Sequence, residues 1–207
     1  AAGATAVTAG AAFVIIPSLT GGDHAFASWT ATPSGMSTQA AADAADGCRS
    51  AQLDGPGERY DDDLRGADVA IAERRGEWTL VTLAGADGFS ALCITDESTP
   101  LFRSWIGSIG ALGDRAAPGP RELVATDLGM GIVNNRELSV AAGFAGSDVA
   151  GVAYRSPTHG EVEATVSGGR FAFWLPGGEL EGASRAGVEV RVTYQDGSTA
   201  TQRIDLQ

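Results

Sequence analysis

Two cysteines, Cys48 and Cys93, carry the chemistry that is easiest to assign in this chain. They are too far apart for a CxxC motif. A tetrahedral zinc site would need both of them to converge with the two histidines, His24 and His159, from distant segments. In an exported protein such a pair predicts one disulfide, which would stabilise the fold by roughly 4 kcal/mol. Two buried free thiols are the alternative.

Carboxylates gather in the segment DGPGERYDDDLRGAD, where Asp61, Asp62 and Asp63 are adjacent. Clustered carboxylates can bind calcium outside the cytoplasm. The spacing lacks the Asp-x-Asp-x-Asp-Gly pattern of an EF-hand loop and its later glutamate. We therefore interpret the segment as a solvated acidic loop, with these three aspartates as weak calcium candidates.

No constellation of catalytic residues stands out. His159 lies in an expected hairpin turn, where it would be exposed, and His24 lies beside Asp23 near the end of the apolar segment. No GxSxG motif occurs. Glu161 and Glu163 share one face of an expected strand, but this spacing is also typical of a solvent-facing edge. We therefore predict no catalytic residue and no cofactor.

The charge balance excludes one class of partner. The net charge is −12, with 26 acidic residues against 14 basic ones, all of them arginine. Nucleic-acid binding needs clustered cations because affinity comes from counterion release along the phosphates. The arginines here are scattered, and no glycine-rich loop leads into a helix with a lysine, so neither nucleic acid nor nucleotide phosphate is expected.

The first 22 residues carry no charge. As a helix, residues 1–19 would span about 28 Å, close to the roughly 30 Å of a bilayer core. The following Ala25-Phe26-Ala27 fits the small-x-small pattern of signal cleavage. We favour a transmembrane anchor over a cleaved signal segment or a buried helix. The first two interpretations place the chain after residue 27 outside the cytoplasm.

The next segment predicts a helix on a small sheet. Residues 33–53 are Ala-rich, with Ser34 or Ser37 as possible caps and small residues at helical spacing. Three short strands follow as an antiparallel meander, with glycine in both turns. Cys48 lies on the small-residue face of the helix, and Cys93 lies on the face of the last strand that this helix would cover. A disulfide between them would therefore fix the helix on the sheet. The strands are expected at 69–74, 77–83 and 89–95.

The long segment 101–137 is rich in glycine and shows no sustained period. We interpret it as a linker, with one short strand near 122–126. A structureless stretch of this length disfavours a single compact unit. The predicted organisation is therefore a membrane segment at 1–27, a helix and sheet at 28–100, a linker at 101–137 and a second domain at 138–207.

The last third alternates apolar and polar residues, with His-Gly, Gly-Gly and Asp-Gly turns. Six strands at this spacing indicate a small immunoglobulin-like β-sandwich without the Cys…Trp…Cys signature. The overall class is thus α+β and mostly β. The expected strands begin at Leu138, Val149, Glu161, Arg170, Gly187 and Thr199.

Two tryptophans are candidates for an interaction surface. Trp174 follows Phe173 in an expected strand, so the two side chains must face opposite ways. One is predicted to be in the core and the other to be a partly exposed anchor or a cover for the neighbouring domain. Trp29 is the second candidate. It lies in the segment AFASWTATP, residues 25–33, which follows the apolar segment and which we call the neck.

Three stretches together resemble a group of uncharacterised actinobacterial membrane-anchored proteins. They are AFASWTATP after the apolar run, the Ala-rich helix with one cysteine, and RFAFWLPG followed by a DG hairpin. The resemblance covers most of residues 11–207. It implies a membrane-anchored extracytoplasmic location and this architecture, and no activity.

Two function classes follow. The first is a non-catalytic extracytoplasmic interaction or sensor module of a membrane-anchored envelope protein. Its partners would be the membrane, through the N-terminal segment, and another envelope protein or a cell-wall component. The alternative is a secreted or anchored hydrolase that cleaves envelope polymers through carboxylates. A pair of acidic residues in a cleft, one with a raised pKa, would favour the hydrolase.

Overall fold

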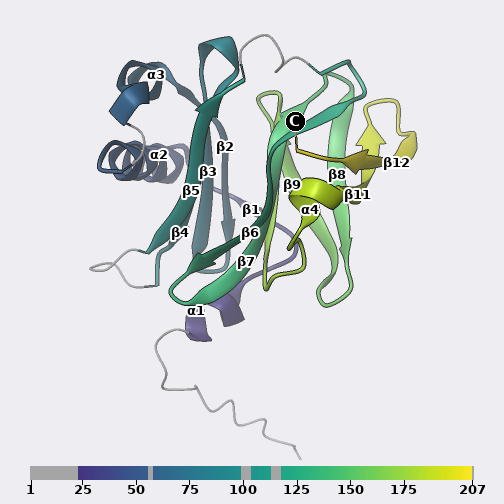
Figure 1. The fold of residues 1–207 in the computed structure, drawn as a ribbon, viewed down its shortest axis with the longest axis horizontal. Helices are drawn as coiled ribbons and strands as arrows, with labels where there is room; N and C mark the ends of the chain where they lie inside the picture. Colours follow the sequence, from purple (N-terminus) through teal and green to yellow (C-terminus); the bar gives the residue numbers. More distant parts are fainter. Residues whose placement is uncertain (1–22, 56–57, 99–103, 113–117, 207) are drawn as a thin grey trace, which may run out of the picture.

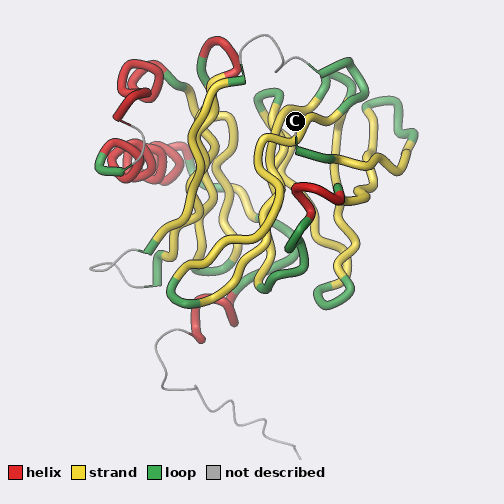
Figure 2. The backbone as a smooth tube through the Cα atoms, in the orientation of Figure 1, coloured by secondary structure: helices red, strands yellow, loops and turns green. Residues whose placement is uncertain are grey.

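The computed structural model of the chain describes residues 23–206, except 56–57, 99–103 and 113–117. The fold is mostly β, and its two antiparallel sheets pack face to face as in a β-sandwich. Figure 1 shows helices on the outer face of the first sheet and the larger second sheet on its other face. The same two layers of strands are visible along the backbone in Figure 2.

The first sheet has five strands in the order β1-β2-β3-β4-β5. Its centre is the predicted meander, which is confirmed. Strand β3 is buried along nearly its whole length, because helices cover one face of the sheet and the second sheet covers the other. The strands are β1 (Ser34–Gly35), β2 (Asp68–Arg75), β3 (Trp78–Ala84), β4 (Phe89–Asp96) and β5 (Trp105–Ala111).

The predicted Ala-rich helix is α2 (Thr38–Leu53), and Ser37 is its N-cap. The Ser37 hydroxyl accepts a hydrogen bond from the Ala40 amide at 3.2 Å, which satisfies one of the free donors of the first turn. Three short helical segments follow along the chain. The 3₁₀ turn η1 (Glu58–Tyr60) and the helix α3 (Asp61–Gly66) come after α2, and the 3₁₀ turn η2 (Ala86–Gly88) joins β3 to β4.

The predicted Cys48–Cys93 disulfide is present and joins α2 to β4. Beside it, the buried Gln52 side chain donates hydrogen bonds to the carbonyl of Leu92 at 3.2 Å and to that of Ser108 at 3.1 Å. A Cβ atom at Gly107 would lie 2.1 Å from the Leu92 carbonyl oxygen, so glycine is required where β5 passes this contact. Helix α2 is therefore tied to the sheet both covalently and by hydrogen bonds.

The prediction of a structureless linker at 101–137 is wrong in part. The segment contains β5 and most of β6 (Leu123–Val133), which is far longer than the short strand expected there. Glycines hide the pattern because they leave gaps in the alternation of side chains that marks a strand. Gly131 shows why they are needed, since a Cβ there would lie 2.1 Å from Cδ1 of Ile106 on β5.

The second sheet has seven strands in the order β12-β11-β8-β9-β10-β7-β6. All six strands predicted for the last third are confirmed. They form one continuous sheet with β6, in place of the two separate sheets of an immunoglobulin-like sandwich. The remaining elements are β7 (Arg136–Ala145), β8 (Val149–Ser156), β9 (Gly160–Ser167), β10 (Arg170–Pro176), α4 (Ala183–Ala186), β11 (Val188–Tyr194) and β12 (Thr199–Ile204).

This sheet curls until its two edges meet. Ala125 on β6 forms a parallel bridge with Leu206, just beyond β12. The concave side encloses a core that includes Phe171, Phe173 and Tyr194. Curling lets one sheet bury its own apolar face, so the second layer has its own core in addition to the one it shares with the first sheet.

A second core lies between the two sheets. Trp78 on β3 and Trp174 on β10 are fully buried there, with ring centroids 5.3 Å apart. Phe173 points the other way, into the curled sheet. The opposite orientation of these neighbours is therefore confirmed, but neither is partly exposed. Trp174 covers the neighbouring layer, and it is not part of an accessible interaction surface.

The N-terminal neck is built into the space between the sheets. Phe26, in helix α1 (Asp23–Ser28), packs on Trp78 with ring centroids 4.8 Å apart. Trp29 is half-buried against Trp174 at 6.1 Å. A Cβ at Gly76, in the β2–β3 turn, would lie 2.0 Å from the Ser28 carbonyl oxygen. The neck is therefore an integral part of the inter-sheet core.

A buried ion pair holds this neck in place. Arg75 and Glu73 on β2 are 0% and 1% exposed, and Nε of Arg75 lies 2.7 Å from a carboxylate oxygen of Glu73. The guanidinium also donates to the carbonyl of Ala31 at 2.7 Å and to that of Glu163, on β9, at 2.5 Å. The Thr165 hydroxyl donates to the other Glu73 oxygen. We call these residues the Arg75 clamp.

Of the predicted membrane or signal segment with the first part of its neck, 1–27, residues 1–22 lie outside the described residues. Among the described helices, none is long and apolar enough to cross a bilayer.

Reduction of the disulfide is expected to destabilise the fold by about 4 kcal/mol, because the bond closes a loop with a sequence separation of 45 residues. Urea unfolding with and without a reductant measures this difference. The Cys48→Ser/Cys93→Ser double variant should match the reduced protein. Equal unfolding midpoints in the oxidised and reduced states would contradict the expectation.

Arg75→Ala is expected to cost about 3–5 kcal/mol, since it leaves the Glu73 carboxylate buried without its partner. The matched control is Arg191→Ala, which removes a surface ion pair with Glu161 whose side chains are 53% and 51% exposed. That control should cost at most about 1 kcal/mol. Urea unfolding compares the two variants. Similar losses in the free energy of unfolding would show that the Arg75 clamp does not contribute more to the stability of the fold than a surface ion pair.

Candidate functional site

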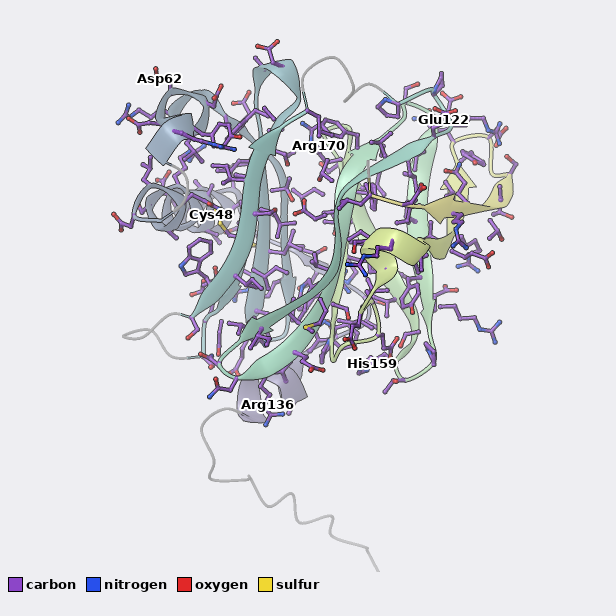
Figure 3. All side chains as sticks on the ribbon, viewed as in Figure 1. Cys48, Asp62, Glu122, Arg136, His159 and Arg170 are labelled. Atoms are coloured by element: carbon purple, nitrogen blue, oxygen red, sulfur yellow. A yellow bond between two sulfur atoms is a disulfide. The ribbon has the colours of Figure 1, made fainter. Side chains whose placement is uncertain are left out.

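The predicted calcium candidates do not converge on a site. Asp61, Asp62 and Asp63 form the first turn of α3, and Asp61 pairs with Arg65 at 2.6 Å. Asp62 points into solvent, as Figure 3 shows at the outer edge of the helical layer. Within the described part of the chain, no group of three or more His, Cys, Asp or Glu side chains could hold a metal ion.

His159 is half-buried, although an exposed position was expected. Its ring lies 5.0 Å from that of Trp29, and Nε2 lies 3.1 Å from the carbonyl oxygen of Pro176. The nearby Ser156 hydroxyl accepts hydrogen bonds from the backbone amides of Thr158 and His159 and donates to Glu179 at 2.9 Å. The serine thus shapes the turn and is not activated by the histidine, so this is no nucleophilic site.

Glu179 illustrates the electrostatics of this turn. Burial alone would raise the pKa of its carboxyl, but hydrogen bonds from Thr158 and Ser156, together with the charge of His159, lower the pKa below its usual value. The carboxylate is therefore stabilised in its ionised form. An ionised, hydrogen-bonded carboxylate is suited to holding a turn and not to donating a proton.

Glu161 and Glu163 lie on the outer face of β9, where both are exposed. Glu161 forms an ion pair with Arg191 at 2.7 Å. The expected solvent-facing position of this pair is confirmed.

The candidate site is a cleft between β5, the last strand of the first sheet, and β6, the edge of the second. It contains a polar cavity of about 290 Å³, which we call the polar chamber. A smaller cavity of about 90 Å³, the apolar pocket, adjoins it between the sheets. Asp127 and Ser108 line both cavities, so they mark the junction. The apolar pocket is also lined by Leu92, Ile94, Ile106, Met130, Leu138 and Val140.

A β-bulge places Asp127 in the cleft. The register of β6 against β7 shifts between Ala125 and Asp127, so that Asp127 pairs with Ala142 and faces the first sheet. Bulges redirect a side chain in this way and occur beside functional sites. Asp127 accepts a hydrogen bond from the Thr126 hydroxyl at 2.8 Å and another from the Ser108 side chain.

Burial raises the pKa of Asp127, and the hydrogen bonds from Ser108 and Thr126 only partly oppose it. Asp127 is the only carboxyl among the described residues that line the two cavities. At the rim, Arg59 is exposed and lies over the ring of Tyr60, with its guanidinium carbon 4.5 Å from the ring centroid. The chamber thus has an acidic interior, hydroxyl-bearing walls and a cationic rim.

A buried arginine lies at the same end of the inter-sheet layer. Arg170, at the start of β10, is 8% exposed and stacks on Phe144, with its guanidinium carbon 3.7 Å from the ring centroid. It donates to the carbonyl of Phe89 at 3.2 Å, and burial lowers its pKa. Figure 3 shows Arg170 between the sheets. This contact fastens the second sheet to the start of β4, which supports the chamber wall at Ser90.

The lining of the polar chamber combines one acidic group with several neutral hydroxyl groups. The described lining has one carboxyl, no second acidic residue, and four hydroxyl-bearing residues, Tyr60, Ser90, Ser108 and Thr126. Sequence reasoning missed Asp127, because it lies in the segment that was interpreted as a linker. Only the pairing of β6 with β7 reveals the bulge that orients it. No protein-family model, curated protein or solved structure matches the chain.

Asp127→Asn is expected to stabilise the protein at neutral pH. The raised pKa means that the folded state favours the protonated carboxyl, so stability falls as pH rises from the unfolded pKa of about 4 through the folded pKa. The asparagine side chain does not ionise, so the variant does not lose this stability. Urea unfolding should therefore show a higher free energy of unfolding for the variant at pH 7, and the difference should shrink toward pH 4.

The matched control is Asp205→Asn, at an exposed position near the C-terminus. It should leave stability nearly unchanged at both pH values. If Asp127→Asn is destabilising at pH 7, the carboxylate is stabilised in the fold and the assigned electrostatics are wrong.

Proposed function

We propose that this chain is a non-catalytic extracytoplasmic interaction or sensor module of a membrane-anchored bacterial envelope protein, with the β5–β6 cleft as its ligand site. The observation that carries the proposal is the composition of the cleft. A single carboxyl at the junction of a polar and an apolar cavity, walled by hydroxyls, is the arrangement of a binding pocket with a few polar groups that fix orientation.

The disulfide supports an extracytoplasmic location. Disulfides persist in oxidising compartments and are rare in the cytosol of mesophiles. Both cysteines are engaged in the Cys48–Cys93 bond, and free cysteines are absent from the described residues. The resemblance to actinobacterial membrane-anchored proteins points to the same location.

The packing of the neck supports a retained anchor over a cleaved signal. Cleavage after Ala27 would remove Phe26, which packs on Trp78 and lies beneath the guanidinium of Arg136, with 5.9 Å between the guanidinium carbon and the ring centroid. It would also leave Ser28 as the new terminus, where its hydroxyl accepts the Glu77 amide at 2.9 Å. Cleavage there would thus remove a contact of the inter-sheet core, and in the proposed arrangement the preceding apolar run serves as the link to the membrane.

A carboxylate-dependent hydrolase is the second candidate, and one observation favours it. A raised pKa is what a general acid needs, and Asp127 has one. A glycosidase also needs a second carboxyl about 5–9.5 Å away. Among the described residues that line the cleft there is none, so binding is the stronger proposal.

The test is whether envelope compounds bind without being consumed. The purified full chain in detergent is incubated with a low-molecular-mass extract of bacterial envelopes, and its melting temperature is measured. We expect a rise for the wild type and none for Asp127→Asn, with the extract unchanged by mass spectrometry. The control Glu161→Gln, on the outer face, should respond like the wild type.

New products of lower mass that disappear with Asp127→Asn would overturn the binding function in favour of the hydrolase. A melting temperature that does not respond, or that rises equally in Asp127→Asn, would show that the cleft is not the ligand site. A separate measurement on fractionated cells gives the intact mass of the protein in the membrane and soluble fractions. A soluble species beginning at Ser28 would overturn the retained anchor.

A further inference from the structure

The polar chamber carries opposite charges at separate places. The Asp127 carboxyl lies at its inner junction with the apolar pocket, and the Arg59 guanidinium lies at its rim beside Tyr60. Arg59 lines only the chamber, whereas Asp127 also lines the apolar pocket. A ligand that fills the chamber therefore meets an acidic group at its inner end and a basic group at its outer end.

The inner end is suited to an amino group. An ammonium has three hydrogen-bond donors, and Asp127 offers carboxylate oxygens next to the hydroxyls of Ser108 and Thr126. An ammonium would also offset the burial that disfavours the ionised carboxyl. The chain has a net charge of −12, which attracts cationic groups to the protein in general.

The rim is suited to a carboxylate. Arg59 is exposed, and a guanidinium binds a carboxylate through two parallel hydrogen bonds. Its contact with the Tyr60 hydroxyl, at 2.5 Å, fixes the side chain at the rim while leaving other N–H donors for a ligand.

The apolar pocket fixes the third feature of the ligand. It opens from the junction at Asp127 and is lined mainly by aliphatic side chains such as Leu92, Ile106 and Val140. Its volume of about 90 Å³ limits it to a compact group. The group that enters it must branch from the ligand close to the amino group, because both cavities meet at Asp127.

We propose that the β5–β6 cleft binds a small zwitterion of amino-acid type, with its amino group at Asp127, its apolar side chain in the apolar pocket and its carboxylate at Arg59. This inference rests on the proposed function of the cleft as a ligand site. A free amino acid and the N-terminal residue of a short peptide share this chemistry. A neutral saccharide would neutralise neither charge and would leave the apolar pocket unfilled, and a phosphate would be repelled by the ionised Asp127 carboxylate.

The test is calorimetric titration of the full chain in detergent with valine and four relatives. Valinamide lacks the carboxylate, 3-methylbutanoate lacks the amino group, glycine lacks the side chain, and valylglycine presents the same group as a peptide. We expect valine or valylglycine to bind and each of the three reduced compounds to bind at least about tenfold more weakly. Tighter binding of valylglycine would identify a peptide as the source, and tighter binding of valine a free amino acid.

Variants assign each contact. Arg59→Gln should weaken valine binding about tenfold and leave valinamide binding unchanged. Asp127→Asn should weaken the binding of both valine and valinamide and leave the binding of 3-methylbutanoate unchanged. The control Arg191→Gln, which removes a positive charge from the outer face, should bind valine like the wild type.

Absence of binding by both valine and valylglycine, or equal binding to Asp127→Asn, would overturn the zwitterion proposal. The extract experiment separates this failure from failure of the proposed function. If envelope extract still raises the melting temperature of the wild type and not of Asp127→Asn, the cleft binds a ligand of another class. If neither experiment responds, both proposals fall.

Discussion

The two layers of this protein depend on a charge that is buried between them. The Arg75 guanidinium reaches the carboxylate of its own strand, the carbonyl of Ala31 in the neck and the carbonyl of Glu163 in the opposite sheet. A buried arginine is unfavourable unless its donors find partners, so these three segments must meet in one arrangement. The same requirement fixes Trp29 and Phe26 at the inter-sheet core. The neck is thus positioned by hydrogen-bond satisfaction as well as by apolar burial.

The cleft lies where this close packing ends. Large aromatic side chains fill the layer between β3 and β10, whereas glycines at 110 and 131 leave little side-chain volume where β5 faces β6. Two cavities remain there, and a bulge turns Asp127 toward them. A carboxyl would be unfavourable in the aromatic part of the layer. At its edge, hydroxyls and nearby solvent permit it, so the position of the candidate site follows from the distribution of side-chain volume.

Local signals in the sequence predicted the elements that alternate or turn sharply. The six strands of the last third, the meander and the Ser37-capped helix are confirmed, and so is the disulfide, because helical and strand periods placed both cysteines on facing surfaces. The glycine-rich strand β5 and most of β6 were missed, since glycine leaves no pattern to detect. Asp127, the burial of Trp174 and the bridge from Ala125 to Leu206 depend on contacts between distant segments. No local period encodes such contacts.

The clamped neck has a mechanical consequence. A chain pulled from its N-terminal side first loads the packing of Phe26 on Trp78 and the hydrogen bond between Ser28 and Glu77. It then loads the hydrogen bond that holds Ala31 to Arg75, before any strand is stretched along its length. If those bonds yield, the disulfide stops extension between Cys48 and Cys93, whose sequence separation is 45 residues. At about 3.4 Å per extended residue, roughly 150 Å of chain stays closed. Tension applied through the neck would therefore be borne by a side-chain clamp and a covalent loop, and the β5–β6 cleft borders that protected loop.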